Sequence, residues 1–390
     1  MSFPFRLPVF TDGITSCSEI TGDNPDELCS EKVIADNPEM LIFVKKRAIE
    51  NGANAILAPT GNATRKKLSE FGENEAFSDI NSTITKITAK TSGSSLVGGV
   101  VYSSGLFVPP YGEDSFEAIY FSYLEKITVL KAANADFILL YNQNNLFDMR
   151  AAVLAAKAVD IPVFAVMNVD ADGKSESGND YIAALITLQA MGADAFGIYC
   201  TDGTDSQTEL IKTAFSHSEI PLIAVTDTEQ ISEKQLSELA ESGASVFIDK
   251  AFQRSNKIVP ALAEVKLKFN EKEEKDSYAA AIDSEAFFLP DNIELSAPVT
   301  CGYDMSDEII DLDDETINAI YIFLNSTDDA ALLADNASMS RLPFIIHTND
   351  AVTLEAALRY YQGRIIVDTC CDIDENVLKT LSKKYGAILY

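Results

Sequence analysis

Short apolar runs that fit β-strands alternate along this chain with segments that fit helices. A turn rich in Gly, Ala, Asn or Asp precedes several of these runs, as in NGANA, ANADF, MGADA and SGASV. Parallel strands need a crossover connection, usually a helix, so this order is typical of βα units in a parallel sheet. The strands that we predict in the first part of the chain are 8–13, 54–60, 95–103, 136–142, 162–169, 194–200, 221–227 and 245–251.

The segments between these runs carry helix signals. Residues 38–52, PEMLIFVKKRAIENG, have Pro38 in the first turn and stop at Gly52, and residues 149–160 are rich in Ala. Eight βα units over residues 1–268 predict an α/β fold, a (β/α)8 TIM barrel. An open doubly wound sheet is the alternative, but it would need a Gly-rich phosphate loop after the first strand, and TDGITS is not such a loop.

A charged stretch separates the predicted barrel from a smaller unit. Residues 266–278, KLKFNEKEEKDSY, are poor in branched residues, and we place a linker at 269–284. For residues 285–390 we predict a truncated α/β half-barrel, because this segment is too short for a second whole barrel. Its exposed edge would be covered by the first barrel or by a homodimer. The expected strands of this unit are 292–301, 318–324, 343–348, 364–370 and 387–390.

The composition excludes some classes of partner. The 390 residues are 47% hydrophobic and 23% charged, which fits a globular protein with a full core. The formal net charge of −30 argues against nucleic acid and against a membrane surface as partners, because both would repel this chain. The N-terminus lacks a signal-peptide pattern, and six cysteines without a repeated spacing indicate free thiols. We therefore expect a cytoplasmic protein.

Several segments resemble one known family. Over about residues 5–265 the chain resembles the homocysteine S-methyltransferase barrel, as in the N-terminal module of cobalamin-dependent methionine synthase. The C-terminal residues 342–390 are similar to the first half of the folate (pterin-binding) barrel of that enzyme, and the two parts come in the same order. The segments that carry the barrel resemblance are ILAPTGNATRKKLSEFG (56–72), GLFVPPYGEDSFEAIYFSYLEKI (105–127), MRAAVLAAKAVDIPVFAVMNVDADGKSESG (149–178) and DAFGIYCTDG (194–203).

The resemblance implies methyl transfer to the sulfur of homocysteine, a small thiol amino acid. The family barrel holds zinc through three cysteines, one after strand six and two adjacent ones after strand eight, and the zinc keeps the substrate sulfur as a thiolate. Cys200 occupies the strand-six position, whereas Lys250 and Ala251 stand where the adjacent pair belongs. One thiolate cannot hold Zn²⁺ by itself, so zinc is implied by the resemblance but opposed by these residues. Asp249 or Cys17 could join Cys200 in a mixed site.

Other parts of the methyl-transfer machinery would have to come from outside this chain. We find no cobalamin-binding domain, so a corrinoid carrier would be a separate protein. The resemblance gives the substrate-binding candidates Asp12, Thr60, Asn62 and Tyr141, where Tyr141 replaces a carboxylate of the family. Asn62, or Thr64 nearby, could instead cap the following helix. We assign no catalytic residue.

The second unit offers a different set of candidate metal ligands. Cys301, His347 and Cys370 each fall at the C-terminal end of a predicted strand, and parallel strands bring such ends together. One His and two Cys are a valid transition-metal set. The alternative is that these cysteines, like Cys200 in the barrel, are ordinary reduced thiols.

Three functions stay open at this point. The first is a homocysteine S-methyltransferase-like enzyme, and the second is a non-catalytic homologue that binds a small molecule or regulates. The third is an enzyme with altered chemistry that uses Tyr141, Asp249 and Lys250 at the barrel mouth. A lysine amine at a strand end could form a Schiff base with a carbonyl substrate.

Overall fold

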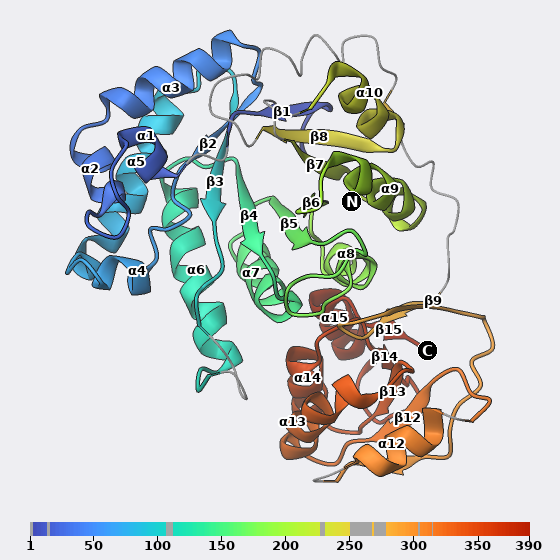
Figure 1. The fold of residues 1–390 in the computed structure, drawn as a ribbon. Coiled ribbons are helices and arrows are strands. Elements are labelled where there is room, and N and C mark those ends of the chain that lie inside the picture. Colours follow the sequence, from blue (N-terminus) through green and yellow to red (C-terminus); the bar gives the residue numbers. More distant parts are fainter. Residues whose placement is uncertain are drawn as a thin grey trace.

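Eight parallel strands close into a barrel in the first part of the chain (Figure 1). The computed structural model describes residues 3–13, 16–106, 112–226, 231–249, 267–268, 278–302, 305–313 and 315–390. The strands follow chain order, and β1 pairs with β8 as well as with β2, which confirms the predicted TIM barrel and excludes the open sheet. The strands are β1 (Val9–Thr11), β2 (Ala55–Ala58), β3 (Leu96–Val101), β4 (Phe137–Gln143), β5 (Val163–Val169), β6 (Ala195–Cys200), β7 (Leu222–Thr226) and β8 (Ala244–Asp249).

Helices connect these strands, and left-handed turns end several of them. Gly52, Asn134, Gly192 and Gly243 all have positive φ, so the recurrent turn of the sequence is a repeated backbone conformation that reverses the chain into the next strand. Among the described residues, no helix is long and apolar enough to cross a bilayer. The helices are α1 (Cys17–Thr21), α2 (Ser30–Asp36), α3 (Glu39–Glu50), α4 (Arg65–Ser69), η1 (Asn74–Ala76), α5 (Phe77–Thr91), α6 (Phe116–Ala132), α7 (Leu146–Ala158), α8 (Tyr181–Ala190), α9 (Thr204–His217) and α10 (Glu233–Glu241).

The barrel has two apolar layers, because side chains alternate along each strand. The inner layer fills the barrel, and the rings of Phe137 and Phe164 stack there with centroids 4.5 Å apart. Phe3 and Phe5, which precede β1, pack against these two rings. The outer layer packs the strands against the helices, as with Phe196 of β6. The barrel interior is therefore a packed core rather than a channel.

The second unit contains a hairpin and a smaller parallel sheet. Its five strands lie side by side in chain order, as a partial barrel requires. Within the stretch where we placed a linker, residues 278–281 form a strand of the hairpin, and the domain boundaries stay predictions. The elements are β9 (Tyr278–Ala281), β10 (Ala286–Leu289), β11 (Val299–Thr300), α12 (Ser306–Asp313), β12 (Ile320–Phe323), α13 (Thr327–Asn336), η3 (Ala337–Met339), β13 (Phe344–His347), α14 (Ala351–Tyr360), β14 (Ile366–Val367), α15 (Glu375–Tyr385) and β15 (Ile388–Leu389).

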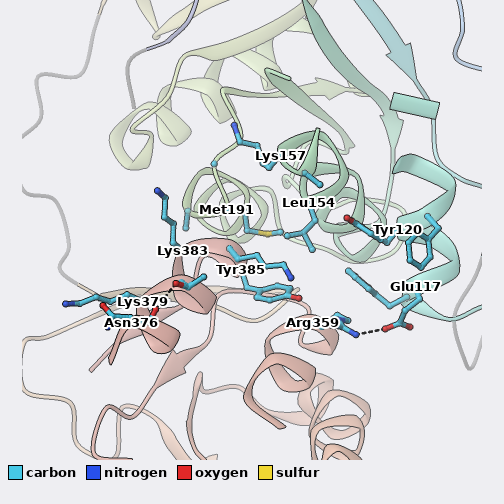
Figure 2. Close-up of a pocket in the computed structure, with 17 residues that line it drawn as sticks. Glu117, Tyr120, Leu154, Lys157, Met191, Arg359, Asn376, Lys379, Lys383 and Tyr385 are labelled. Atoms are coloured by element: carbon cyan, nitrogen blue, oxygen red, sulfur yellow. Dashed lines mark hydrogen bonds and ion pairs between the residues drawn. The ribbon is translucent and has the colours of Figure 1, made fainter. Parts of the chain in front are cut away.

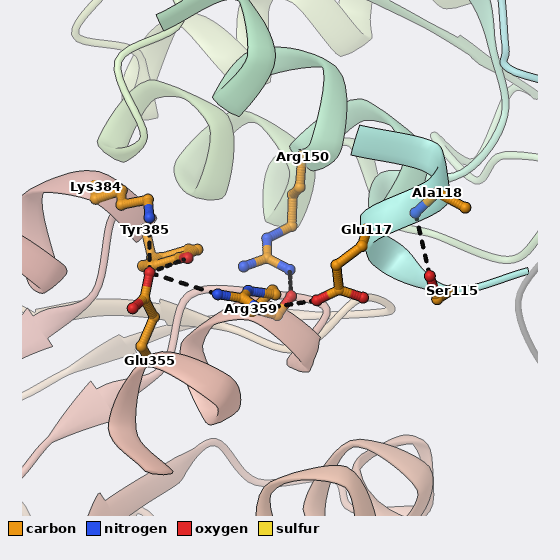
Figure 3. Close-up of polar contacts among 8 residues, drawn as sticks. All are labelled: Ser115, Glu117, Ala118, Arg150, Glu355, Arg359, Lys384 and Tyr385. Atoms are coloured by element: carbon orange, nitrogen blue, oxygen red, sulfur yellow. Dashed lines mark hydrogen bonds and ion pairs between the residues drawn. The ribbon is translucent and has the colours of Figure 1, made fainter. Parts of the chain in front are cut away.

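The helices α6, α7 and α8 of the barrel contact the helices α14 and α15 of the second unit, and α8 also packs against the hairpin β9–β10 (Figures 1 and 3). The guanidinium of Arg150 on α7 donates to backbone carbonyls at the end of α14. Arg359 of α14 forms an ion pair with Glu117 of α6 at 2.8 Å. A Cβ on Gly386 would lie 2.9 Å from the backbone nitrogen of Met191, so the chain after α15 closely approaches the end of α8.

Candidate functional site

The C-terminal ends of the barrel strands form the mouth where TIM barrels carry their sites. Tyr102, Tyr141 and Tyr199, from the ends of β3, β4 and β6, belong to the inner layer there. The rings of Tyr102 and Tyr141 have centroids 6.0 Å apart. Burial raises the pKa of both hydroxyls, and the carboxylate of Glu19 adds to the shift of each, so both stay protonated. The inner wall of the mouth is therefore aromatic with neutral hydroxyl groups, and it contains the predicted Tyr141.

The loop after β2 lies directly against this wall. A Cβ on Gly61 would lie 2.6 Å from the Tyr102 ring, so only glycine allows the ring to cover the loop. Asn62 borders a cavity of about 10 Å³ beside Tyr102, which is close to the smallest volume that holds a water molecule. Thr64, not Asn62, caps α4, because its side chain accepts a hydrogen bond from the Lys67 backbone at 3.1 Å. Substrate binding by Asn62 stays a prediction.

Asp12 and Thr60 are both buried and engaged inside the protein. One carboxylate oxygen of Asp12 lies 2.5 Å from Nζ of Lys45, and the other accepts the backbone N–H of Leu57 at 2.7 Å. Burial raises the pKa of Asp12 despite the opposing charge of Lys45. The hydroxyl of Thr60 donates to the carbonyl of Val100 at 2.8 Å. These contacts tie the first strands together, and a role of either side chain in substrate binding remains a prediction.

Sequence reasoning missed a buried polar group behind the β2 loop. Lys126 of α6 donates to the carbonyls of Thr60 at 2.6 Å and of Gly61 at 2.9 Å. Burial lowers the pKa of Lys126 to about 7, although the nearby Glu31 and Cys17 favour its charged form. The thiol of Cys17 donates to the carbonyl of Pro59 at 3.1 Å. These groups hold the loop in shape from outside the barrel.

A signal for this group was present in the sequence. Tyr123, Lys126, Ile127 and Leu130 are spaced as one face of a helix, and all four are buried. A lysine in such an apolar stripe predicts a buried ammonium that needs oxygen acceptors nearby.

Cys200, the strand-six candidate, ends β6 but belongs to the outer layer of the barrel. It shares that layer with Phe196 and Ile198, whereas Tyr199, between Ile198 and Cys200, belongs to the inner layer. Its thiol donates to the carbonyl of Asp170 at 3.6 Å and is 4% exposed. Burial raises the pKa of Cys200, so the thiol stays protonated at neutral pH. This environment is typical of a structural thiol.

The residues of the mouth do not fit a zinc centre with three thiolates. The sequence has no cysteine between Cys200 and Cys301, and Asp249 at the end of β8 is fully buried. Among the described residues, which include Cys17, no group of three or more His, Cys, Asp or Glu side chains is arranged to hold a metal ion. Lys250 and Ala251 lie outside the described residues. We therefore derive no step through zinc.

The candidate ligands of the second unit have other partners. Nδ1 of His347 lies 2.9 Å from the carboxylate of Asp368, which also accepts the hydroxyl of Tyr321. Burial alone would raise the pKa of Asp368, but the hydrogen bonds from Tyr321, the Cys370 backbone and His347 outweigh it and lower the pKa. The thiol of Cys301 donates to the carbonyl of Asp329 at 3.2 Å, and Cys370 is exposed. A metal at these residues stays a prediction, and the described contact is a Tyr–Asp–His cluster.

Comparison with known proteins gives this barrel a family. The closed ring of eight parallel strands defines the class, a TIM-barrel protein. The family model described as homocysteine S-methyltransferase matches residues 14–256, so the chain belongs to the homocysteine S-methyltransferase family.

Individual relatives agree with this assignment. Over 208 residues the chain is 26% identical to methionine synthase of Mycobacterium tuberculosis, covering 50% of this chain and 17% of that protein. It is 22% identical over 210 residues to methionine synthase of Mycobacterium leprae. The chain thus matches only 17% of the length of either relative. The barrel is similar to the metallated homocysteine methyltransferase MmuM of Escherichia coli, with a TM-score of 0.56 and 18% identity, covering 65% of this chain and 95% of that one.

Proposed function

We propose that this chain binds a small thiol or amino acid at the mouth of its barrel, as a non-catalytic homologue with a binding or regulatory role. Membership of the homocysteine S-methyltransferase family supports the ligand class. The observation that carries the proposal is the placement of Cys200, a protonated thiol in the outer layer, while Tyr102, Tyr141 and Tyr199 line the inner mouth. None of these four side chains is a cation, and none could hold one that stabilises the thiolate of a substrate as a nucleophile.

We infer that a ligand bound beside Asn62 displaces the Tyr102 ring, which borders the small cavity there. The cavity beside Asn62 holds about 10 Å³, which is far below the volume of an amino acid. The chain contains 14 tyrosines and no tryptophan, so a change in its intrinsic fluorescence comes from tyrosine side chains, Tyr102 among them. Titration with L-homocysteine, followed by calorimetry and by tyrosine fluorescence, tests the proposal. We expect saturable binding with a change in tyrosine emission. The absence of a signal in both measurements would exclude homocysteine as the ligand.

A pair of variants locates the binding. Asn62→Ala removes the amide that borders the small cavity, and we expect it to weaken homocysteine binding about ten-fold, the effect of one lost hydrogen bond to a charged ligand group. Asn325→Ala, at an exposed position of the second unit, is the matched control and should leave binding unchanged. Equal affinity in the two variants would place the ligand elsewhere.

Methyl transfer to homocysteine is the second candidate, and the match of the family model over residues 14–256 favours it. The test is methionine formation, measured by mass spectrometry, with methylcobalamin or a separate methylated corrinoid protein as donor. Homocysteine binding without methionine supports the non-catalytic proposal. Methionine formation at a rate proportional to the concentration of this protein would contradict the non-catalytic proposal and show that the protein is a methyltransferase.

We also propose that the second unit is a truncated relative of the pterin-binding barrel. Five parallel strands in chain order support this, because the first half of a (β/α)8 barrel has the same arrangement. In the Tyr321–Asp368–His347 cluster, His347 ends β13 and Asp368 directly follows β14, while Tyr321 reaches them from within β12. Calorimetry with tetrahydrofolate tests whether pterin binding persists, and binding that is insensitive to His347→Ala would contradict a site at this cluster.

A further inference from the structure

A large cavity lies between the barrel and the second unit, away from the barrel mouth (Figure 2). Its volume is about 880 Å³, within the range of small-molecule sites. One wall comes from α6, α7 and the end of α8, and the other comes from α14 and α15. The cavity is open to solvent along one side, so it is a groove at the junction that a small molecule can enter.

The barrel wall of this cavity is mostly apolar. Phe116 and Tyr120 of α6, Leu154 of α7 and Met191 after α8 line it, and Figure 2 shows Tyr385 of the second unit across from Leu154 and Met191. Phe121 also lines the cavity and is 59% exposed, which is unusual for a ring of that size. This surface suits the aromatic or aliphatic body of a ligand.

The wall of the second unit is cationic. Lys379, Lys383 and Lys384 come from consecutive turns of α15, and Arg359 comes from α14. Lys157 faces them from the barrel side. The cavity therefore gathers five cations in a chain whose formal net charge is −30. Whether these cations attract an anion depends on how many of them carboxylates already neutralise.

Carboxylates balance four of these five cations. Arg359 pairs with Glu117 at 2.8 Å, and Lys384 pairs with Glu355 at 2.7 Å (Figure 3). Lys157 pairs with Asp194 at 3.3 Å, and Lys379 pairs with Glu375 at 2.5 Å.

Lys383 is the exception. It lines the cavity, it is exposed, and it has no ion pair in the described parts of the chain. One positive charge is thus left over at the rim of an apolar space.

We propose that this cavity binds a small amphipathic anion. Its apolar body lies against Leu154 and Met191, and its carboxylate, sulfonate or phosphate group faces Lys383 at the same end of the cavity (Figure 2). Because the two walls come from different units, the bound anion bridges the barrel and the second unit and stabilises their junction. This site is separate from the barrel mouth, so the proposal does not depend on the function proposed above.

The probe for the test is 1-anilinonaphthalene-8-sulfonate, an aromatic sulfonate whose fluorescence rises in apolar surroundings. N-phenyl-1-naphthylamine has the same rings without the charge and separates the apolar from the ionic contribution. We expect the folded full-length chain to bind the sulfonate at one site. The double variant Lys379→Gln/Lys383→Gln should weaken sulfonate binding about ten-fold, roughly the effect of two partly exposed charge pairs, and leave the neutral probe unaffected.

Matched controls are available on the barrel surface. Lys212→Gln/Lys234→Gln removes two exposed lysines of α9 and α10 and should change neither probe. Phe121→Ser should weaken both probes, whereas Phe43→Ser, which alters a ring that is 58% exposed on α3, should weaken neither. Circular dichroism confirms that each variant is folded before binding is measured.

Three results would overturn the proposal. The first is sulfonate binding that the Lys379/Lys383 double variant leaves unchanged. The second is equal loss of both probes in that variant, which would show a general disturbance of the junction. The third is binding of poly-glutamate without binding of the sulfonate, where the Lys379/Lys383 double variant weakens the poly-glutamate binding. This result would assign the surface to an acidic peptide partner. Sulfonate binding that follows the expected pattern supports the assignment.

Discussion

The guanidinium of Arg150 in the barrel helix α7 donates to the backbone carbonyl of Leu358, in helix α14 of the second unit, at 2.7 Å. It also donates to the carbonyl of Arg359 at 3.2 Å, and its side chain is 1% exposed. Burial lowers the pKa of Arg150 to about 10, so it remains charged at neutral pH. A buried cation on the last carbonyls of a helix satisfies groups that have no partner within the helix and matches the helix dipole. This barrel side chain thus contributes directly to the junction between the two units.

Replacement of this arginine should loosen the junction. Arg150→Met keeps the apolar stem but leaves the carbonyls of Leu358 and Arg359 without their donor, which we expect to cost about 1–3 kcal/mol of unfolding free energy. Urea unfolding measures the loss, and limited proteolysis should show earlier cleavage of the second unit. Lys86→Met, at an exposed position of α5, is the control. Unchanged proteolysis in Arg150→Met would contradict a joining role for this residue.

Asp12 and Lys45 should behave as one coupled pair. Both side chains are buried, so Asp12→Asn or Lys45→Met alone leaves an uncompensated charge or an unpaired polar group, at a cost of about 3–5 kcal/mol. The double variant should lose less than the sum of the two single losses. A double-mutant cycle by chemical denaturation measures this coupling. Strictly additive losses would show that the pair does not act as a unit.

Lys126 should make stability depend on pH. Its pKa in the folded chain is lowered by burial to about 7, while an unfolded lysine titrates near 10.4. Between these values the unfolded chain binds more protons, so the free energy of unfolding rises with pH, by at most about 1.4 kcal/mol per pH unit. Urea unfolding at pH 7.5 and 9.0 should show this gain in the wild-type chain.

Two lysine variants separate this effect from other titrations. Lys126→Met should lose the gain between pH 7.5 and 9.0, whereas Lys86→Met, at an exposed position of α5, should keep it. The same pH dependence in all three proteins would contradict a buried lysine with a lowered pKa.

The six thiols should differ in reactivity. Cys370 is exposed, whereas Cys17, Cys29 and Cys200 are buried, and burial raises the pKa of these three thiols. In the native chain we expect Ellman's reagent to modify Cys370 rapidly and the buried thiols only after unfolding. Cys370→Ser should abolish the rapid phase. Rapid native labelling of Cys200, identified by peptide mass mapping, would contradict its placement in the outer layer.

The barrel could be predicted from the sequence because its signals are local. The predicted strands 54–60 and 194–200 contain β2 and β6, and the repeated turn appears as positive φ at Gly52 and Gly192. Helix α7 begins at Leu146, three residues before the predicted start, because Asn145 caps it. A cap of this kind depends on one side chain, so element ends are harder to predict than elements.

The candidate site was harder to predict because it depends on which face each side chain takes. Cys200 was placed at the end of β6 correctly, but whether it points inward depends on the strand register, and Tyr199 takes the inner position. Likewise, the ends of β11, β13 and β14 lie in one sheet, yet His347 contacts Asp368, and Cys301 turns to the carbonyl of Asp329. Contacts of this kind join distant segments and leave no local pattern in the sequence.

The zinc content of the purified chain tests the central claim most directly. Cys200 offers one protonated thiol in the outer layer, and no cysteine follows it before Cys301, so we expect far less than one zinc per chain after dialysis against zinc-containing buffer. Elemental analysis by mass spectrometry measures this ratio, with Cys200→Ala as the comparison. One tightly held zinc per chain that is lost in Cys200→Ala would contradict the account and restore thiol methylation as the function.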